Sequence, residues 1–383
     1  MQRRVPKLKL PNSEELNIGY LSRLFDNTTN CYKFFWFQAI LRKIDCKRNQ
    51  FSFEELINEM IVDAWYMVSE YHLRLGPIGI TDNLEEIIKY IHENYNFRPS
   101  EKRENIISFL NGTEDKRIAK YKSDLTLNVP YRLQVPFYDE ITIERNMWGS
   151  SKKQLTEEIN RQRRLMYYFI LINGLGTVIE VDNLWAEYLY KHKEILKGWT
   201  QLKLIQYLQN KNPSVPGIAD KIEAPIVRDI DRVRKYWKLI IQIDPSLHDI
   251  YGGINLESEA LSVDHFVPWQ YVAHDELWNL HPTTRSINSS KSNQLPSWAM
   301  YFESLSEIEY RAYQLMQENE LVAHEFSKIA PYHLNNQEIR NQLYTKDLSA
   351  PDYKTRLEHV IRPVFESAQN CGFKEWVYES NKV

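Results

Sequence analysis

Hydrophobic positions in the first third of the chain recur at helical spacing. In the segment Phe53–His72 the apolar residues fall on one stripe, which predicts an amphipathic helix. Tyr32–Leu41 is apolar on nearly every side and is typical of a buried helix. The segment Asn12–Glu15 has the residues of a capped helix start, and another helix is expected from Asp82 to Asn94. We therefore expect helices up to about residue 111.

The middle of the chain has a different pattern. Prolines interrupt Val129–Tyr131 and Val135–Phe137, which predicts extended or loop structure there. Met166–Ile172 and Thr177–Val181 are apolar runs typical of strands. Gly174–Gly176 lies between them and predicts a hairpin turn, because it lacks the further glycines of a phosphate-binding loop.

Helical spacing returns at Leu184–Leu208 and again from about Ser304 onward. Asn212–Gly217 carries two prolines and a glycine and is predicted to be a linker. Pro225–Ile243 is predicted to be a helix, with Pro225 at its first position. These patterns divide the chain into four predicted regions: a helical domain (1–120), a mixed region (121–215), a domain with the candidate chemistry (216–303) and a helical region (304–383).

Composition narrows the class of protein. The 383 residues include 24 Tyr, 15 Phe and 10 Trp, a content that fits both large aromatic cores and stacking on bases, and only 12 Gly, which favours helices. The formal net charge of −3 excludes a uniformly basic nucleic-acid-binding protein. Local basic patches are expected at Lys152–Arg164 and at Arg228–Lys238; for both, a DNA-facing surface and a solvated face remain open.

The chain has no sign of export or membrane insertion. Its N-terminus is charged and lacks an apolar core, so we expect no secretory signal. The most apolar stretch, Tyr167–Val181, is too short and too interrupted to span a bilayer. Three separate cysteines exclude a disulfide framework and a cysteine zinc knuckle. We therefore expect a cytoplasmic protein without a membrane partner.

The candidate chemistry lies between Ile254 and Pro296. Leu261–Val263 is predicted to be a short strand that ends in Asp-His, and Leu277–Pro282 a second strand. A loop of mixed polarity separates them, and Thr283–Asn293 is predicted to be a short helix. Strand, loop, strand and helix is the layout of a ββα-metal nuclease site.

The residue types fit phosphodiester hydrolysis, which needs an activated water and a positive centre. Asp264 and His265 are adjacent on a strand, so their side chains point to opposite faces. Asn288 and Lys291 are three positions apart and share one helix face. A histidine can accept the proton of the water near neutral pH, while a carboxylate and an amide oxygen can hold one Mg²⁺-like ion.

Three short motifs carry a resemblance to a known family. Asp264–Pro268 (DHFVP), Asn279–Pro282 (NLHP) and Asn288–Asn293 (NSSKSN) follow the pattern D-H-x-x-P, N-L-x-P and N-x-x-K-x-N. The segment resembles HNH endonucleases without a zinc knuckle, such as the HNH domain of RNA-guided CRISPR nucleases. The third signature position is Asn288 instead of histidine, which is a common variant of the family.

The resemblance implies a role for each motif residue. His265 would be the general base, Asp264 and Asn288 would hold one Mg²⁺ or Mn²⁺, and Asn279 would brace the loop. The fold would be mainly α with a small α+β insert, in which helical regions surround a ββα-metal nuclease core. The residues expected to contact nucleic acid are Lys291, Arg285 (for which a solvated face is the alternative) and Asn293.

The motifs and their resemblance thus predict a metal-dependent HNH endonuclease that cuts DNA. Phe34–Trp36 and the helical N-terminal half also resemble bacterial HNH proteins, some of them linked to defence against phage, so restriction or defence is the expected context. Two alternatives remain open: a sensing protein whose HNH segment is silent until a partner activates it, and an RNA-cutting toxin. Zinc bound by His265, His274 and His281 is a further, unfavoured alternative.

Overall fold

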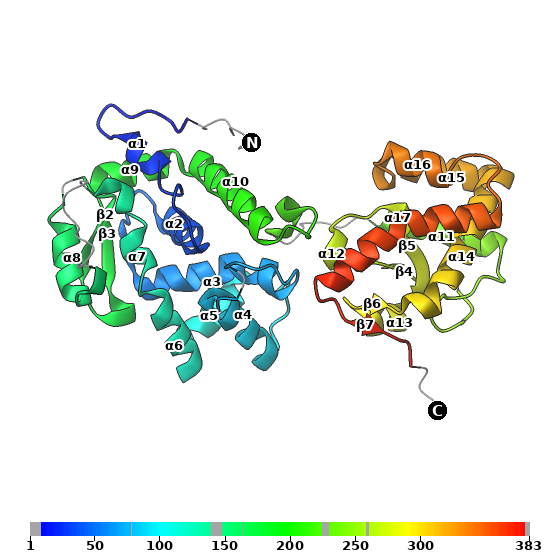
Figure 1. Ribbon diagram of the computed structural model, residues 1–383, viewed down its shortest axis with the longest axis horizontal. Coiled ribbons are helices and arrows are strands. Elements are labelled where there is room, and N and C mark those ends of the chain that lie inside the picture. Colours follow the sequence, from blue (N-terminus) through cyan, green and yellow to red (C-terminus); the bar gives the residue numbers. More distant parts are fainter. Residues whose placement is uncertain are drawn as a thin grey trace. The chain divides into compact units, whose positions relative to one another are not determined.

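The computed structural model describes residues 9–77, 79–138, 148–162, 164–223, 230–257 and 260–379. The chain forms two compact units (Figure 1). Unit 1 comprises Met1–Pro213 and Lys221–Ala224, and unit 2 comprises Ser214–Asp220 and Pro225–Val383. One boundary therefore falls inside the segment 212–217 that the sequence predicts to be a linker.

Unit 1 is mostly helical. Its long helix α3 begins with a capping box, in which Ser52 accepts from the backbone of Glu55 and the Glu55 carboxylate bonds back to the Ser52 backbone. Trp36, in the buried helix α2, packs edge-on against Phe53 in α3. The helices of unit 1 are α1 (Ile18–Ser22), α2 (Tyr32–Lys43), α3 (Phe53–Ser69), α4 (Asn83–Asn94), α5 (Arg103–Gly112), α6 (Lys116–Leu125), α7 (Val129–Arg132), α8 (Lys152–Asn160), α9 (Asn183–Lys191) and α10 (Lys193–Lys211).

An antiparallel sheet of three strands completes unit 1, in the order β1 (Gln50–Ser52), β3 (Val178–Val181) and β2 (Tyr167–Leu171). The predicted hairpin between β2 and β3 is confirmed, and its Gly174 has a φ of +51°, which favours glycine. Side-chain amides satisfy backbone groups of β2. Gln134 bonds both the N–H and the C=O of Tyr167, and Asn160 does the same at Phe169.

Two local predictions in unit 1 are wrong. Val129–Arg132 forms a helical turn and Val135–Phe137 a 3-10 turn, because each proline occupies the first turn, where it donates no intrahelical hydrogen bond. The first helix does not begin at Ser13. The Ser13 side chain instead accepts two backbone bonds in a turn, and Asn17 caps α1.

Unit 2 contains the segment with the candidate chemistry, and its strands pair as β4 with β5 and β6 with β7. The helix predicted over 225–243 is observed from Asp231, and Pro225 lies outside the described residues. The elements are α11 (Asp231–Ile243), β4 (Leu261–His265), α12 (Trp269–Val272), β5 (Leu280–Thr284), α13 (Arg285–Lys291), β6 (Leu295–Pro296), α14 (Trp298–Glu318), α15 (Glu320–His333), α16 (Gln337–Leu343), α17 (Ala350–Asn370) and β7 (Glu375–Trp376).

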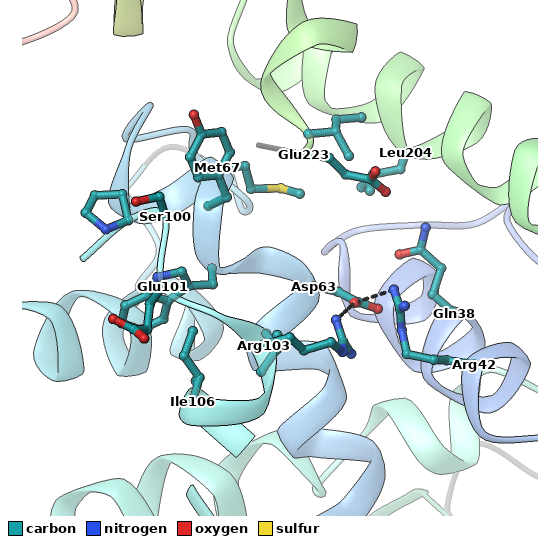
Figure 2. Close-up of a pocket in the computed structure, with 15 residues that line it drawn as sticks. Gln38, Arg42, Asp63, Met67, Ser100, Glu101, Arg103, Ile106, Leu204 and Glu223 are labelled. Carbon is teal, nitrogen blue, oxygen red and sulfur yellow. Dashed lines mark hydrogen bonds and ion pairs between the residues drawn. The ribbon is translucent and has the colours of Figure 1, made fainter. Parts of the chain in front are cut away.

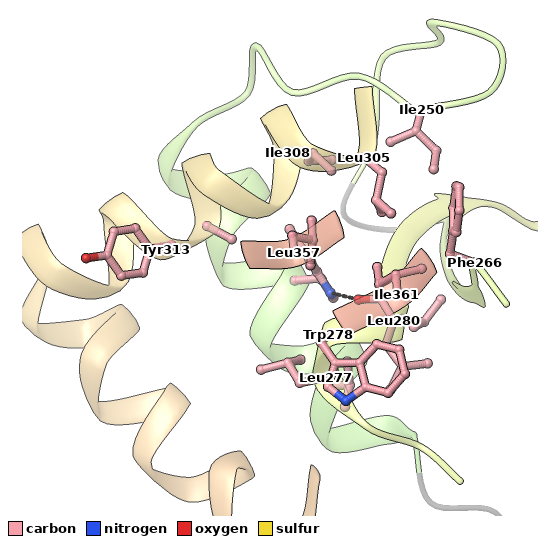
Figure 3. Packing of buried hydrophobic residues seen from close by; sticks show 14 of the residues in the cluster. Ile250, Phe266, Leu277, Trp278, Leu280, Leu305, Ile308, Tyr313, Leu357 and Ile361 are labelled. Atoms are coloured by element: carbon pink, nitrogen blue, oxygen red, sulfur yellow. Dashed lines mark hydrogen bonds between the residues drawn. The ribbon is translucent and has the colours of Figure 1, made fainter. Parts of the chain in front are cut away.

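The core of unit 2 fixes the β4–β5 ribbon from several helices. Figure 3 shows Phe266 and Leu280 of the ribbon region among apolar side chains of α14 and α17 such as Leu305 and Leu357. The indole N–H of Trp237 in α11 donates to the carbonyl of Leu280 at 3.0 Å. The predicted fold class, mainly α with a small α+β insert, is confirmed. Among the described residues, no helix combines the length and hydropathy needed to cross a bilayer.

Candidate functional site

The predicted Asp-His pair lies at the end of β4, in an antiparallel ribbon with β5. Asp264 is opposite His281 and His265 is opposite Leu280, so the Asp264 and His265 side chains leave opposite faces of the ribbon. β5 is shorter than predicted, because Leu277–Asn279 forms a 3-10 turn before the strand begins. The turn brings Asn279 against the loop that follows His265.

Asp264 is the buried acceptor of the site. Its Oδ2 accepts from the Tyr251 hydroxyl at 2.8 Å and lies 3.0 Å from the Lys291 ammonium. Burial alone would raise the pKa of Asp264, but Lys291, His281 and Tyr251 together outweigh burial, so the pKa lies below its ordinary value. Asp264 is therefore an ionised carboxylate at neutral pH, as a hard cation requires of a ligand.

His265 is held by a carboxylate that the sequence analysis missed. Its Nε2 lies 2.8 Å from Oδ1 of Asp275, and its side chain is 7% exposed. Asp275 is in the loop between α12 and the 3-10 turn, where no periodicity indicates which way a side chain points. In the sequence, only its position between the first two motifs of the HNH resemblance pointed to it.

Asn279 bonds the backbone of the loop after His265, and the bracing role that the resemblance implies for it stays a prediction. Its amide donates to the Val267 carbonyl at 2.8 Å, and its Oδ1 accepts from the Val267 N–H at 2.7 Å. Its backbone carbonyl also accepts from the N–H of Phe266. The Asn279 side chain is fully buried, and its residue satisfies backbone groups of Phe266 and Val267 that a neighbouring strand would otherwise bond. These bonds fix the direction of the backbone where β4 ends.

Asn288 and Lys291 both reach β4 from helix α13, as their shared helix face predicted. The Asn288 amide nitrogen donates to Ser262 Oγ at 2.8 Å and to the Val263 carbonyl at 3.1 Å. Both amide hydrogens are thereby used next to Asp264, and the carbonyl oxygen is the atom that can serve as a ligand. A carboxylate and an amide oxygen are hard donors, so the residues present fit one Mg²⁺ or Mn²⁺.

Lys291 has a different environment from the one predicted. Its ammonium is fully buried and donates to the His265 carbonyl at 2.7 Å, besides pairing with Asp264. The long side chain turns inward along the helix face, and a phosphate contact of Lys291 stays a prediction. Arg285 and Asn293 are exposed at the two ends of α13, so a nucleic-acid contact stays a prediction for both.

His281 lies beside the carboxylate without bonding to it. Its Nε2 is 3.7 Å from Asp264 Oδ2, and burial lowers its pKa to about 3, so the ring is neutral at physiological pH. Neither ring nitrogen has a hydrogen-bond partner in the described part of the chain. The described residues also contain no group of three or more His, Cys, Asp or Glu able to hold a metal, which gives the zinc alternative no support.

Several basic side chains of the predicted patches have partners within the chain. In α11, Arg234 pairs with Asp231 and Arg232 stacks over the ring of Tyr332 at 4.0 Å; Arg228 lies outside the described residues. In α8, the Lys152 ammonium donates to the Leu127 carbonyl at 2.7 Å. A DNA-facing role stays a prediction for both patches.

Unit 1 has a cavity of about 300 Å³ that contains none of the predicted site residues. Figure 2 shows Asp63 at its floor, where Arg42 and Arg103 donate to one carboxylate oxygen at 2.8 and 2.6 Å. Burial raises the pKa of Asp63 to about 6, although Arg42 opposes the shift. The guanidiniums are thus already paired, which makes this cavity a poor phosphate site.

A carboxylate and a histidine at the end of an antiparallel ribbon, followed by a helix that offers an amide, form the arrangement that the sequence predicts for a ββα-metal site. Residues 249–297 match the family model described as HNH endonuclease. This segment of unit 2 is therefore similar to an HNH endonuclease domain, which is a nuclease domain acting on nucleic acid. No curated protein and no solved structure matches the chain.

Proposed function

We propose that this protein is a metal-dependent endonuclease that hydrolyses phosphodiester bonds in DNA. The observation that supports it most is that Asp264 and His265 end strand β4 and the Asn288 amide bonds the same strand, inside the segment similar to HNH endonucleases. Asp264 and Asn288 would hold one Mg²⁺ or Mn²⁺ through oxygen atoms. Such a cation supplies positive charge for the scissile phosphate and the departing 3′ oxygen.

The chain's own residues divide the remaining work. His265 accepts a proton from the attacking water. Because Asp275 accepts a hydrogen from Nε2, the lone pair of the neutral ring is at Nδ1, and that nitrogen takes the proton. Lys291 and Tyr251 keep Asp264 charged and in place. Attack in line with the 3′ oxygen gives 5′-phosphate and 3′-hydroxyl products.

A plasmid-nicking assay tests this proposal. We expect cleavage with Mg²⁺ or Mn²⁺ that stops on addition of EDTA and falls about 10²–10⁴-fold in His265→Ala, which lacks the general base. His324→Ala is the matched control, because His324 is exposed on α15 in the same unit. Equal cutting by the wild type and His265→Ala would refute the assignment. Duplex DNA, single-stranded DNA and RNA in parallel identify the substrate.

We further propose that the activity serves restriction or defence against phage in the bacterial cytoplasm, which rests on the resemblance of the helical half and not on the site. Unit 1 contains none of the motif residues and is available to recognise a target or a partner protein. Phage plating on cells that express the wild type or His265→Ala tests this step. Equal plating efficiency on both strains would contradict it.

A further inference from the structure

We infer that Asp275 is the positioning residue of His265, and that the end of helix α15 holds Asp275 in place. The inference rests on the proposed function, because it assigns a role relative to the general base. It makes the C-terminal helices part of the catalytic geometry, although they lie outside the matched segment 249–297.

The contact between the two side chains is short and protected. Asp275 Oδ1 lies 2.8 Å from His265 Nε2, and the exposed fractions of the two side chains are 19% and 7%. A carboxylate accepts only, so a neutral imidazole must carry its hydrogen on Nε2 to make this bond. Asp275 therefore sets both the tautomer and the ring orientation of His265.

Asp275 is not held by regular structure of its own. Helix α12 ends at Val272, and Ala273 adopts a left-handed conformation with φ 54° and ψ 30°. The 3-10 turn begins only at Leu277. The four residues between these elements have no strand or helix to fix them, so contacts from elsewhere must determine where the Asp275 carboxylate points.

Those contacts come from residues at the end of α15. The carbonyl of Asp275 accepts from Nδ1 of His333, which is 58 positions away in the sequence, at 2.7 Å. The neighbouring Glu276 carboxylate accepts from the backbone N–H of Asn335 at 3.0 Å and from its side-chain amide at 2.8 Å. We call these bonds, made by His333 and Asn335 to Asp275 and Glu276, the α15 clamp.

The α15 clamp holds the backbone carbonyl of Asp275 and the side chain of the next residue, Glu276, so it restrains the backbone from which the Asp275 side chain projects. His333 is 5% exposed and Glu276 is 8% exposed, which means that water competes poorly for these bonds. Without the clamp, His265 keeps its chemistry but loses its fixed orientation. The loss should therefore appear in kcat and not in KM or in metal binding.

Kinetics of the full-length protein on an oligonucleotide duplex test the inference. Asp275→Asn should lower kcat about 10–100-fold, the usual loss when a residue that orients an active group is changed, with KM and Mn²⁺ affinity unchanged. His333→Ala and Asn335→Ala should lower kcat several-fold in the same way. Asp244→Asn is the matched control, because it breaks a comparable ion pair with Arg311 in unit 2, away from the motif.

A spectroscopic measurement separates positioning from general stability. In ¹⁵N-histidine-labelled protein, the His265 signals of the wild type should report hydrogen on Nε2. Asp275→Asn should shift them toward a mixture of tautomers, while Asp244→Asn should not. If Asp275→Asn does not fold, Asn335→Ala, which keeps the carboxylate, carries the same test.

Two outcomes distinguish the failure of this inference from that of the proposed function. Unchanged kcat and unchanged His265 signals in Asp275→Asn, with cleavage abolished in His265→Ala, would overturn the inference and keep the function. Undiminished cleavage in His265→Ala would overturn the function. In that case the tautomer shift still decides whether Asp275 positions the histidine.

Discussion

Two antiparallel strand pairs, one in each unit, are stabilised in the same way: side-chain amides bond backbone groups that have no neighbouring strand. In the β2–β3 pair, the amides of Gln134 and Asn160 bond backbone groups of β2. In the β4–β5 pair, Asn279 bonds the N–H and C=O of Val267. In all three cases a side-chain amide replaces a missing neighbouring strand.

The difference lies in the connections and in what they bury. A short glycine turn joins β2 to β3, and the paired residues are apolar or solvated. The longer connection between β4 and β5 spans residues 266–279 and carries Asp275, while the ribbon itself buries Asp264, His265 and His281. The comparison teaches that a connection must be long enough to fold back before it can return a polar side chain such as Asp275 to the end of a strand.

The largest expected effect comes from removing the cation that balances the buried carboxylate. Lys291→Met leaves Asp264 charged and unpaired, and should lower the free energy of unfolding by about 3–5 kcal/mol. Lys235→Met, on the exposed side of α11, should change it by less than about 0.5 kcal/mol. Urea denaturation of the full chain measures both. Equal stability of the two variants would mean that the buried charges of the β4–β5 pair are incidental.

Comparison with a second buried carboxyl group separates the effect of Lys291 on the pKa of Asp264 from the effect of burial. Glu309 is buried like Asp264, but no cation of the described part of the chain pairs with it, and burial raises its pKa well above the ordinary 4.5. The folded state therefore binds a proton that the unfolded state releases above pH 4.5. Stability should fall as pH rises from there, by about 1.4 kcal/mol per pH unit, until the folded-state pKa is reached.

Glu309→Gln cannot ionise and should remove this pH dependence, so its advantage over the wild type should grow from pH 5 to pH 7. Glu307→Gln, two positions away and exposed, is the control and should follow the wild type. Denaturation midpoints at several pH values decide the point. A constant difference between Glu309→Gln and the wild type would contradict the neutral state of Glu309.

The two amide braces can be compared directly. Asn279→Ala and Asn160→Ala each leave a backbone N–H and C=O without their side-chain partner, so each should cost about 1–3 kcal/mol of stability. Only Asn279→Ala should also reduce cleavage, because only its loop follows His265. Thermal melting and the nicking assay on both variants test this. A comparable loss of cleavage in Asn160→Ala would remove the distinction between the two pairs.

The smallest expected effect concerns the exposed end of α13. If Arg285 contacts a phosphate, Arg285→Ala should weaken DNA binding a few-fold and reduce the slope of log affinity against log salt by about one. Binding titrations at several salt concentrations measure the slope. Exposed Lys235→Ala on α11 is the control, and the same slope in both variants would favour a solvated face for Arg285.

Much of this fold follows from local patterns. Strand β4 and the hairpin at Gly174 were predicted because alternation and turn chemistry act over a few residues. The turns at Pro130 and Pro136 were missed because proline both breaks a helix and suits its first turn, and only the tertiary context decides.

The sequence predicted those parts of the candidate site in which the spacing of residues along a helix determines where their side chains point. Asn288 and Lys291 do share a face, but spacing could not tell whether the lysine points to solvent or into the core. Asp275 and Tyr251 could not be assigned at all, because each reaches the motif from an irregular segment. Such contacts are settled by packing between distant parts of the chain, which periodicity does not record.

The parallel pairing of β6 with β7 sets an order of events during synthesis. Leu295 lies four positions after the last residue of α13, whereas its partner Glu375 is translated after α14 to α17. The neighbouring Trp376 packs edge-on against Tyr251, which bonds Asp264. In a ribosome-bound chain from which Glu375 and Trp376 have not yet emerged, Tyr251 lacks its packing partner, and the Asp264 carboxylate that it bonds is less well held. Cleavage competence should therefore arise only late in translation, and stalled chains of increasing length would show when.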